Sequence, residues 1–293
     1  MATNSPRAVF VVRETDYELL IARHATREQA RFFLETRGQR INEVERRHGQ
    51  FEATLKAARA AVPGEWRQAL VRRADFDRFL FGPQDVIVAV GQDGLVANVA
   101  KYLDGQPVLG INPAPDLYDG VLVRVPLDRL SRALQGEAQV EARTMVEARL
   151  DTGERLLSLN EIFVGHRSHQ SARYRIAVGD TAEDQSSSGL IVASGTGATG
   201  WAQSIMLATG ASIVLAPMER AIGYFVREPF PSVATGTTLR SGKLTGTALA
   251  VTSRMNDGGV IFADGIEQDF LLFGWGATVN LAPADRTLRL VTA

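Results

Sequence analysis

Four short segments of the sequence combine residue types and spacing that suit chemistry, and the first is Gly91-Gln92-Asp93-Gly94. It follows Val86–Val90, a β-branched run typical of a buried parallel strand. In an open α/β sheet, ligands bind beyond the carboxyl ends of the strands, and glycines together with the N–H groups of a following helix suit a phosphate. Asp93 would then place a carboxylate beside that phosphate. The repulsion between the two negative charges would have to be relieved by a metal ion or by proton transfer. An ordinary Asp-Gly turn explains the segment equally well.

The second segment is a glycine-rich loop, Gly195-Thr196-Gly197-Ala198-Thr199-Gly200, which matches the dinucleotide-binding pattern G-x-G-x-x-G. It stands between a predicted strand and a predicted helix. Glu219 follows at about the distance of the ribose-binding acid of a Rossmann fold, after the apolar run Ile213–Ala216. A Rossmann dehydrogenase is therefore an alternative. However, the β-hairpin pattern after Glu219 leaves no further βαβ units for such a sheet, and we favour a nucleotide-binding loop in another fold.

The third and fourth segments are Asn160-Glu161 and Asp264-Gly265. An amide next to a carboxylate can recognise a ribose diol and an amide-bearing base through paired donors and acceptors. A solvated strand end is the simpler interpretation of Asn160-Glu161 alone. Asp264-Gly265 follows Val260–Ala263, a short apolar run, and this pattern indicates a hairpin turn.

The elements that would position these segments change type along the chain. The first 120 residues alternate apolar runs with helical stretches: strands over 8–12, 86–90 and 107–112, and helices from Thr26, over 41–60 and over 95–103. Later segments alternate with period two, as in Val121–Val125 and Tyr174–Val178, and short strands separated by glycine and Asp-Gly turns follow Gly236. One helix is predicted near 200–208. We therefore predict an α/β domain over 1–120 and a β-rich domain, resembling a β-sandwich, over 121–277.

Composition excludes several classes of function. The 293 residues have a formal net charge of −1, so no overall positive field attracts nucleic acid or an anionic membrane. There is no cysteine for thiolate catalysis, and His166 and His169 are separated by Arg167 and Ser168, so we predict no metal site from protein ligands. No apolar run approaches the roughly 20 residues of a membrane span, and the N-terminus has no secretory apolar region. We expect a cytoplasmic protein. P-loop, protein-kinase and hydrolase motifs are missing.

Taken in order along the chain, the segments resemble the motif series of the NAD kinase family. The series is G-x-D-G at Gly91, Gly-Ile-Asn at Gly110, Asn160-Glu161, the Gly/Thr-rich loop, and the late Asp264-Gly265. The resemblance covers most of the chain from about Val86 onward. Ser186–Gln203, with Gly-Thr-Gly where many bacterial members have Pro-Thr-Gly, is most like the branch that contains the mitochondrial NAD kinases. The resemblance implies a two-domain fold in which the last strand, about 278–293, returns to the α/β domain.

The resemblance also implies roles for individual residues. Asp93 would be the general base that takes the proton from the adenosine 2′-hydroxyl of NAD(H), which attacks the γ-phosphate of ATP while Mg²⁺ neutralises the phosphates. The implied phosphate-binding residues are Gly91, Gly94 and Asn98. The implied NAD-binding residues are Asn160, Glu161, Thr199, Ala202 and Ser204. Further candidates for that site are Ser188, Gly195, Thr196, Gly197 and Asp264.

Several positions depart from the family pattern. Gln92 and Leu95 replace a glycine and a threonine, Asn98 stands where an arginine is frequent, and Ser188 replaces an aspartate before Gly-Leu. The alternatives are therefore a related kinase acting on another hydroxyl acceptor, a nucleoside or a lipid, and a non-catalytic NAD- or ATP-binding regulator. The expected partners are small-molecule nucleotides, with neither nucleic acid nor membrane, and the family implies a homodimer or homotetramer.

Overall fold

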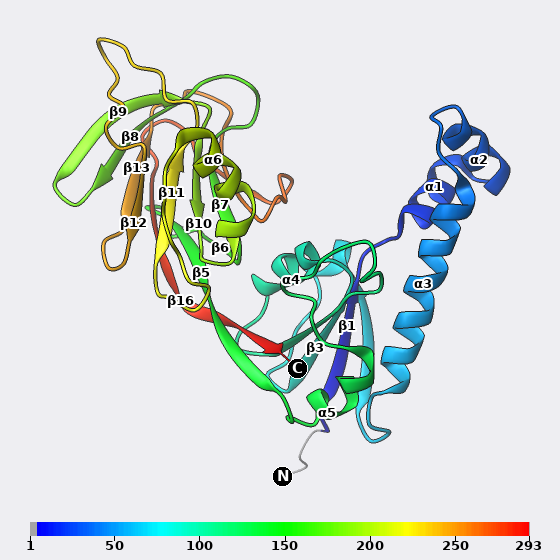
Figure 1. The fold of residues 1–293 in the computed structure, drawn as a ribbon. Coiled ribbons are helices and arrows are strands. Elements are labelled where there is room, and N and C mark those ends of the chain that lie inside the picture. The colour runs from blue at the N-terminus through cyan, green and yellow to red at the C-terminus, as the bar shows by residue number, and fades with distance from the viewer. Residues whose placement is uncertain (1–4, 293) are drawn as a thin grey trace. The chain divides into compact units, whose positions relative to one another are not determined.

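The computed structural model describes residues 5–292 and divides into two compact units (Figure 1). The first unit contains the chain up to Glu141 together with the end from Arg289, and the second contains Ala142–Leu288. The first is α/β and the second is rich in β-structure, so the predicted fold class is confirmed. Within residues 5–292, no helix has both the length and the apolar character that a membrane crossing requires.

A parallel sheet forms the centre of the first unit. Its order is β2 (Arg67–Arg72), β1 (Arg7–Val12), β3 (Asp85–Val90) and β4 (Pro107–Ile111), and the last residues of β16 (Thr278–Thr292) pair with β4. The inner strands β1 and β3 are buried on both faces, as their continuous apolar sequences predict. The return of the final strand to this sheet follows from the register of Arg289 with Pro107.

The connections that follow β1 and β3 run toward opposite edges of this sheet. The chain passes from β1 to β2 through α1 (Asp16–His24), α2 (Arg27–Glu35) and α3 (Ile41–Ala60), and from β3 to β4 through α4 (Asp93–Ala100). In the order β2-β1-β3-β4, the direction reverses between β1 and β3, so the carboxyl ends of these two strands form the topological switch point. Ligands of open α/β sheets bind at this point.

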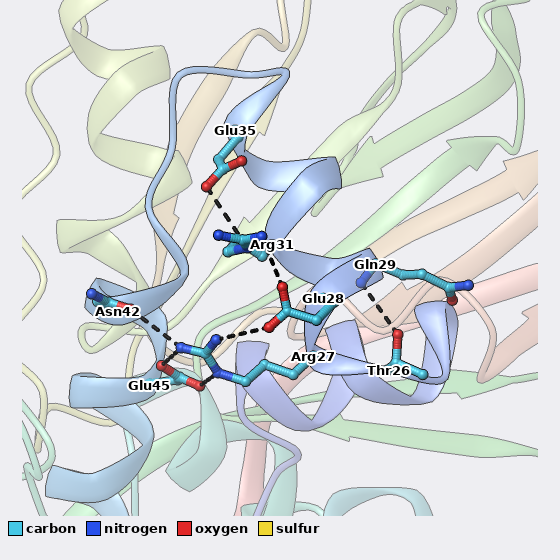
Figure 2. A network of polar contacts seen from close by, with 8 residues as sticks. All are labelled: Thr26, Arg27, Glu28, Gln29, Arg31, Glu35, Asn42 and Glu45. Carbon is cyan, nitrogen blue, oxygen red and sulfur yellow. Dashed lines mark hydrogen bonds and ion pairs between the residues drawn. The ribbon is translucent and has the colours of Figure 1, made fainter.

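Helices α1 and α2 pack against the N-terminal half of α3 and form an arm with it (Figure 1). The predicted cap Thr26 accepts a hydrogen bond from the Gln29 N–H, and an apolar cluster that includes Leu34, Ile41 and Val44 joins α2 to α3. Figure 2 shows the polar contacts that accompany it: the Arg27 guanidinium donates two hydrogen bonds to Glu45, of 2.6 and 2.9 Å. Because these ion pairs are exposed, the apolar cluster contributes most of the stability.

Two predicted elements of the first unit differ from the structure. The helix predicted over 95–103 begins earlier, at Asp93, and ends at Ala100. The strand predicted over 121–125 does not form, and a single bridge joins Arg124 to Ile111. The reason is that the N–H groups of this segment donate to a carboxylate instead of a neighbouring strand. A short 3₁₀ turn (Leu127–Arg129) and α5 (Leu130–Leu134), which the alternating pattern did not predict, follow.

The second unit is a sandwich of two sheets. One is antiparallel with the order β12 (Ser241–Leu244), β11 (Ile222–Val226), β10 (Leu190–Ala193), β7 (Glu161–His166), β14 (Gly259–Ala263) and β15 (Phe270–Leu272). The other contains β5 (Gln139–Leu150), β6 (Arg155–Ser158), β8 (Ala172–Val178), β9 (Thr181–Ser187), β13 (Leu249–Ser253) and part of β16. Ile162 and Val164 of β7 face the core between the sheets, whereas Phe163 faces outward.

The predicted helix of this unit, α6 (Trp201–Thr209), covers the outer face of the six-stranded sheet. A 3₁₀ turn (Gly197–Thr199) leads into it from β10. The apolar run Ile213–Ala216 forms no strand, and Glu219 instead pairs with Lys243 at 2.6 Å. Glu219 is therefore held in an ion pair and not at the end of a parallel strand.

Candidate functional site

Asp93 is the first residue of α4, directly beyond β3 at the switch point. Its carboxylate accepts three backbone hydrogen bonds: Oδ2 from Val121 N–H at 2.8 Å, and Oδ1 from Leu122 and Val123 N–H at 2.8 and 3.2 Å. A carboxylate oxygen has two lone-pair positions, so one on Oδ2 is left unfilled by these contacts. The carboxylate is partly exposed, and it both fixes the 121–123 loop and keeps the capacity to accept a further proton donor.

The glycines beside Asp93 have different surroundings. A Cβ on Gly94 would meet no atom within 4 Å, whereas one on Gly91 would lie 3.0 Å from Leu95 Cδ2. The open space at Gly94 lets a large anion approach the start of α4, where the helix dipole favours negative charge. Asn98 is 5% exposed and accepts a hydrogen bond from Arg73 at 3.4 Å. It therefore lies inside the unit, on the buried side of α4.

Asp264 makes a similar set of contacts in the second unit. Its Oδ1 accepts hydrogen bonds from Ser158 Oγ at 2.7 Å and Asn160 N–H at 2.8 Å, and the N–H groups of Leu159 and Glu161 donate at 3.1 and 3.4 Å. Asp264 has a positive φ of 51°, and its own N–H donates to the Glu161 carbonyl. The hairpin turn predicted at this position is present, and it also holds the Asn160-Glu161 segment in place.

Glu161 has an unusual protonation behaviour because of this arrangement. Burial, and secondarily the charge of nearby Asp264, raises the pKa of Glu161 to about 7. Burial also raises the pKa of Asp264, against the opposing effect of its hydrogen bonds. A carboxyl group with a pKa near 7 donates a hydrogen bond when protonated and accepts when ionised, so Glu161 suits a hydroxyl-rich ligand such as a ribose.

The glycine-rich loop packs directly against Asn160. A Cβ on Gly197 would overlap the carbonyl oxygen of Asn160, and one on Gly195 would overlap that of Ala216, so only glycine allows this close approach. Ser194 N–H donates to the Asn160 carbonyl at 2.9 Å. The hydroxyl of Thr196 is buried without a partner among residues 5–292, which leaves it available to a ligand that reaches the loop.

The remaining predicted residues of the loop differ in exposure. Thr199 and Ser204 are exposed at the start of α6, and the Thr199 hydroxyl donates to the Thr196 carbonyl at 3.1 Å. Ala202 is fully buried among Phe163, Phe225 and neighbouring apolar side chains. Thr199 and Ser204 can therefore reach a ligand with their side chains, whereas Ala202 packs the helix against the sheet.

A cavity of about 360 Å³ lies beside this loop, on the outer face of the six-stranded sheet. The rings of Phe163 and Trp201 line it and are parallel within 2°, with centroids 6.2 Å apart. The Arg227 guanidinium lies 5.1 Å from the centre of the Trp201 ring, and exposed Ser188 is also on the wall. Flat apolar faces beside a cation and a hydroxyl suit a planar polar heterocycle.

The structure thus brings the predicted residues together in two sets. One set lies at one end of the first unit's sheet and contains Gly91, Asp93, Gly94 and Asn98. The other set lies in the second unit, around Asn160-Glu161, the glycine-rich loop and its cavity. Sequence reasoning did not single out Phe163, Trp201 or Arg227. The one available signal was the position of Trp201 directly after Gly200, because an aromatic side chain next to a phosphate-type loop is placed to stack on a base.

The strand pairing excludes the Rossmann alternative. The strand before the glycine-rich loop, β10, is antiparallel to both of its neighbours, β7 and β11. A dinucleotide-binding βαβ unit requires a parallel strand pair around its helix. The loop therefore belongs to a different kind of site.

Comparison with known proteins finds similar chains in sequence and in fold. No family model matches the chain. In sequence, it is 29% identical over 156 residues to the NAD kinase of Chlorobaculum tepidum, covering 51% of each chain. It is 36% identical over 132 residues to the NAD kinase of Heliobacterium modesticaldum, covering 41% of this chain and 46% of that one. The chain thus spans about half the length of these curated relatives.

In fold, the chain is similar to yeast NADH kinase, whose crystal structure was determined in complex with NADH. The TM-score is 0.58 at 15% sequence identity, and the match covers 99% of this chain and 84% of the yeast chain. At that identity the likeness concerns the fold. Eight curated relatives carry the name NAD kinase. In sequence and in fold, the chain is similar to proteins of the NAD kinase family.

Proposed function

We propose that this chain transfers the γ-phosphoryl group of ATP to the adenosine 2′-hydroxyl of NAD(H), giving NADP(H). The observation that carries the proposal is the position of Asp93 beyond β3 at the switch point, with a carboxylate that is fixed by the loop and still open to one more donor. Support also comes from the relatives named NAD kinase.

In the proposed reaction, Asp93 Oδ2 accepts the proton of the attacking hydroxyl. Its other contacts hold the carboxylate in one orientation, so little reorganisation accompanies proton transfer. The hydroxyl oxygen attacks the γ-phosphorus in line, and the bond from that phosphorus to the bridging oxygen of ADP breaks. The start of α4, left open by Gly94, offers backbone N–H groups and a favourable dipole to the phosphates.

The second unit supplies the proposed contacts to NAD(H). Asn160 and Glu161 would bind ribose hydroxyls and an amide, with Asp264 as the residue that positions them. Thr196, Thr199 and Ser204 would contact the nucleotide from the glycine-rich loop. The cavity lined by Phe163, Trp201 and Ser188 would hold one of its two heterocycles.

Several finer assignments are part of the proposal. Mg²⁺ is usually bound by one or two carboxylates together with the substrate's phosphates, so we propose that it arrives with ATP, whose charge it neutralises. We also propose that residues 1–120 form the phosphate-binding domain and 121–277 the NAD-binding domain, that the protein acts in the cytoplasm, and that it forms a homodimer or homotetramer.

The test is a coupled assay for NADP(H) from ATP, Mg²⁺ and either NAD or NADH. Wild type is compared with Asp93→Asn and with Asp119→Asn, which makes the same charge change at an exposed residue two positions before the 121–123 loop. We expect wild type and Asp119→Asn to form NADP(H) and Asp93→Asn to lose turnover while NAD still binds. The preferred acceptor identifies the substrate. Nucleotide binding without any phosphoryl transfer would instead support a regulator, or a kinase with another acceptor.

A further inference from the structure

Asn112, the last residue of the Gly-Ile-Asn motif, directly follows the end of β4 at Ile111. Its side chain makes two hydrogen bonds to the loop that comes next. The Nδ2 group donates to the Tyr118 carbonyl at 2.7 Å, and Oδ1 accepts from the Ala114 N–H at 2.9 Å. One short side chain therefore joins the two ends of residues 113–118.

The loop that Asn112 closes leads into the segment that holds Asp93. Residues 121–123 come shortly after Tyr118 and donate the three N–H groups that the Asp93 carboxylate accepts. This segment belongs to none of the strands that the structure describes, so no strand ladder sets its position. Its place therefore depends on what fixes the chain before it and after it.

After the three donors, the chain is fixed by β4. The Val125 N–H donates to the Gly110 carbonyl at 2.9 Å, and a Cβ on Gly110 would overlap the Leu122 carbonyl oxygen. Only glycine lets the segment cross β4 this closely. Before the three donors, the side chain of Asn112 holds the loop. The glycine and the asparagine of one motif thus fix the chain on both sides of the N–H groups that Asp93 accepts.

We propose that Asn112 is a positioning residue for the phosphoryl transfer. It closes residues 113–118, so that the N–H groups of residues 121–123 hold the Asp93 carboxylate in the orientation that accepts the proton. This inference rests on the proposed function, in which Asp93 is the base. Asn112 acts through the loop and not on the substrate, so its removal changes turnover and leaves the affinity for NAD(H) unaltered.

Two substitutions divide the contacts of this side chain. Asn112→Ala removes both hydrogen bonds. Asn112→Ser keeps an oxygen that can accept from the Ala114 N–H, as serine does in turns, but has no amide to reach the Tyr118 carbonyl. The matched control is Asp116→Asn, a change at an exposed position of the same loop.

The first measurement is kcat and KM for NADP(H) formation by these variants, with thermal unfolding as the check that each is folded. A misplacement of about 1 Å costs a rate of about a hundredfold, so we expect kcat to fall roughly ten- to a hundredfold in Asn112→Ala. The fall should be smaller in Asn112→Ser and absent in Asp116→Asn, with KM for NAD(H) unchanged in all three. In the Asp93→Asn background, Asn112→Ala should cause no further loss, because both residues act through one carboxylate.

The second measurement is amide hydrogen exchange of residues 121–123, followed by mass spectrometry, which reports on the loop without any turnover. We expect exchange at least about tenfold faster in Asn112→Ala than in wild type, and equal to wild type in Asp116→Asn.

The outcomes separate this inference from the proposed function. Wild-type kcat or wild-type exchange in Asn112→Ala overturns the positioning role and leaves the kinase activity standing. A raised KM with unchanged kcat, or a full further loss in the Asp93→Asn background, also overturns it, because Asn112 would then act independently of Asp93. If the wild-type chain forms no NADP(H), the proposed function fails, and faster exchange in Asn112→Ala still supports the link from Asn112 to the segment that holds Asp93.

Discussion

Asp93 and Asp264 both stand next to a glycine, and each gathers the backbone N–H groups of a distant segment. Asp93 accepts from three N–H groups of residues 121–123, and Asp264 accepts from Ser158 Oγ and three N–H groups of residues 159–161. The environments differ. Both residues are partly exposed, but Asp93 starts a helix, whereas Asp264 lies in a hairpin turn where burial of the carboxylate raises its pKa.

The difference shows how one contact pattern serves two roles. In the hairpin, the carboxylate is surrounded by its own chain and acts as a structural anchor for Asn160-Glu161. At the switch point, the carboxylate keeps an open position at the edge of a sheet where ligands bind. Removing Asp264 should therefore affect stability above all, and removing Asp93 should affect turnover above all.

The largest expected effect on stability comes from Asp264→Ala. The substitution removes the acceptor of three N–H groups and one of the two acceptors of the Ser158 hydroxyl, in a partly buried position. Each unsatisfied buried donor costs about 1–3 kcal/mol, and with partial relaxation we expect a loss of about 4 kcal/mol in the free energy of unfolding. Denaturant titration measures it. Asp93→Ala removes the acceptor of three N–H groups and of no hydroxyl, so it should lose less, and equal losses would contradict the distinction between the two sites.

A smaller effect concerns Glu161. Because the pKa of Glu161 is raised to about 7 from its usual 4.5, the folded state binds an extra proton between these values. The contribution of Glu161 to the free energy of unfolding is therefore greatest below about pH 4.5. It falls by on the order of 3 kcal/mol as the pH rises to about 7. Glu161→Gln should remove this slope from the pH dependence of unfolding. A slope of the wild-type size in the variant would assign the proton to another group, such as Asp264, whose pKa is also raised.

The smallest effect on stability is expected for Gly94→Ala. A Cβ there meets no atom within 4 Å, and alanine favours a helix over glycine by up to about 1 kcal/mol. We therefore expect equal or slightly increased stability together with a higher KM for ATP, because the methyl group occupies the approach of the phosphates. A KM equal to that of wild type would show that the phosphates do not reach the start of α4.

The elements that could be predicted from the sequence are those fixed by local pattern. Four such elements are where the sequence predicts them: the strands β1 and β3, the Thr26 cap and the helix over 41–60. Their burial and capping depend on residues that are neighbours in the sequence. The segment 121–125 has the alternation of a strand, but its N–H groups bind Asp93, nearly thirty residues away in the chain.

The candidate site was predictable only in part for the same reason. The residues Asp93, Asn160 and Glu161 carry polar chemistry in recognisable motifs. The anchoring role of Asp264 and the parallel rings of Phe163 and Trp201 depend on contacts between segments far apart in the sequence. Local pattern shows a hairpin or a core aromatic at these positions, and only the tertiary structure brings them beside the other candidate residues.

The most direct test of the account is the turnover number of Asp93→Asn in NADP(H) formation from ATP and NAD(H), measured beside wild type. General base catalysis contributes roughly 10²–10⁴-fold, so the account predicts a fall of at least a hundredfold, with NAD affinity retained and most of the stability kept. A variant that turns over at the wild-type rate would contradict the assignment of Asp93 as the base.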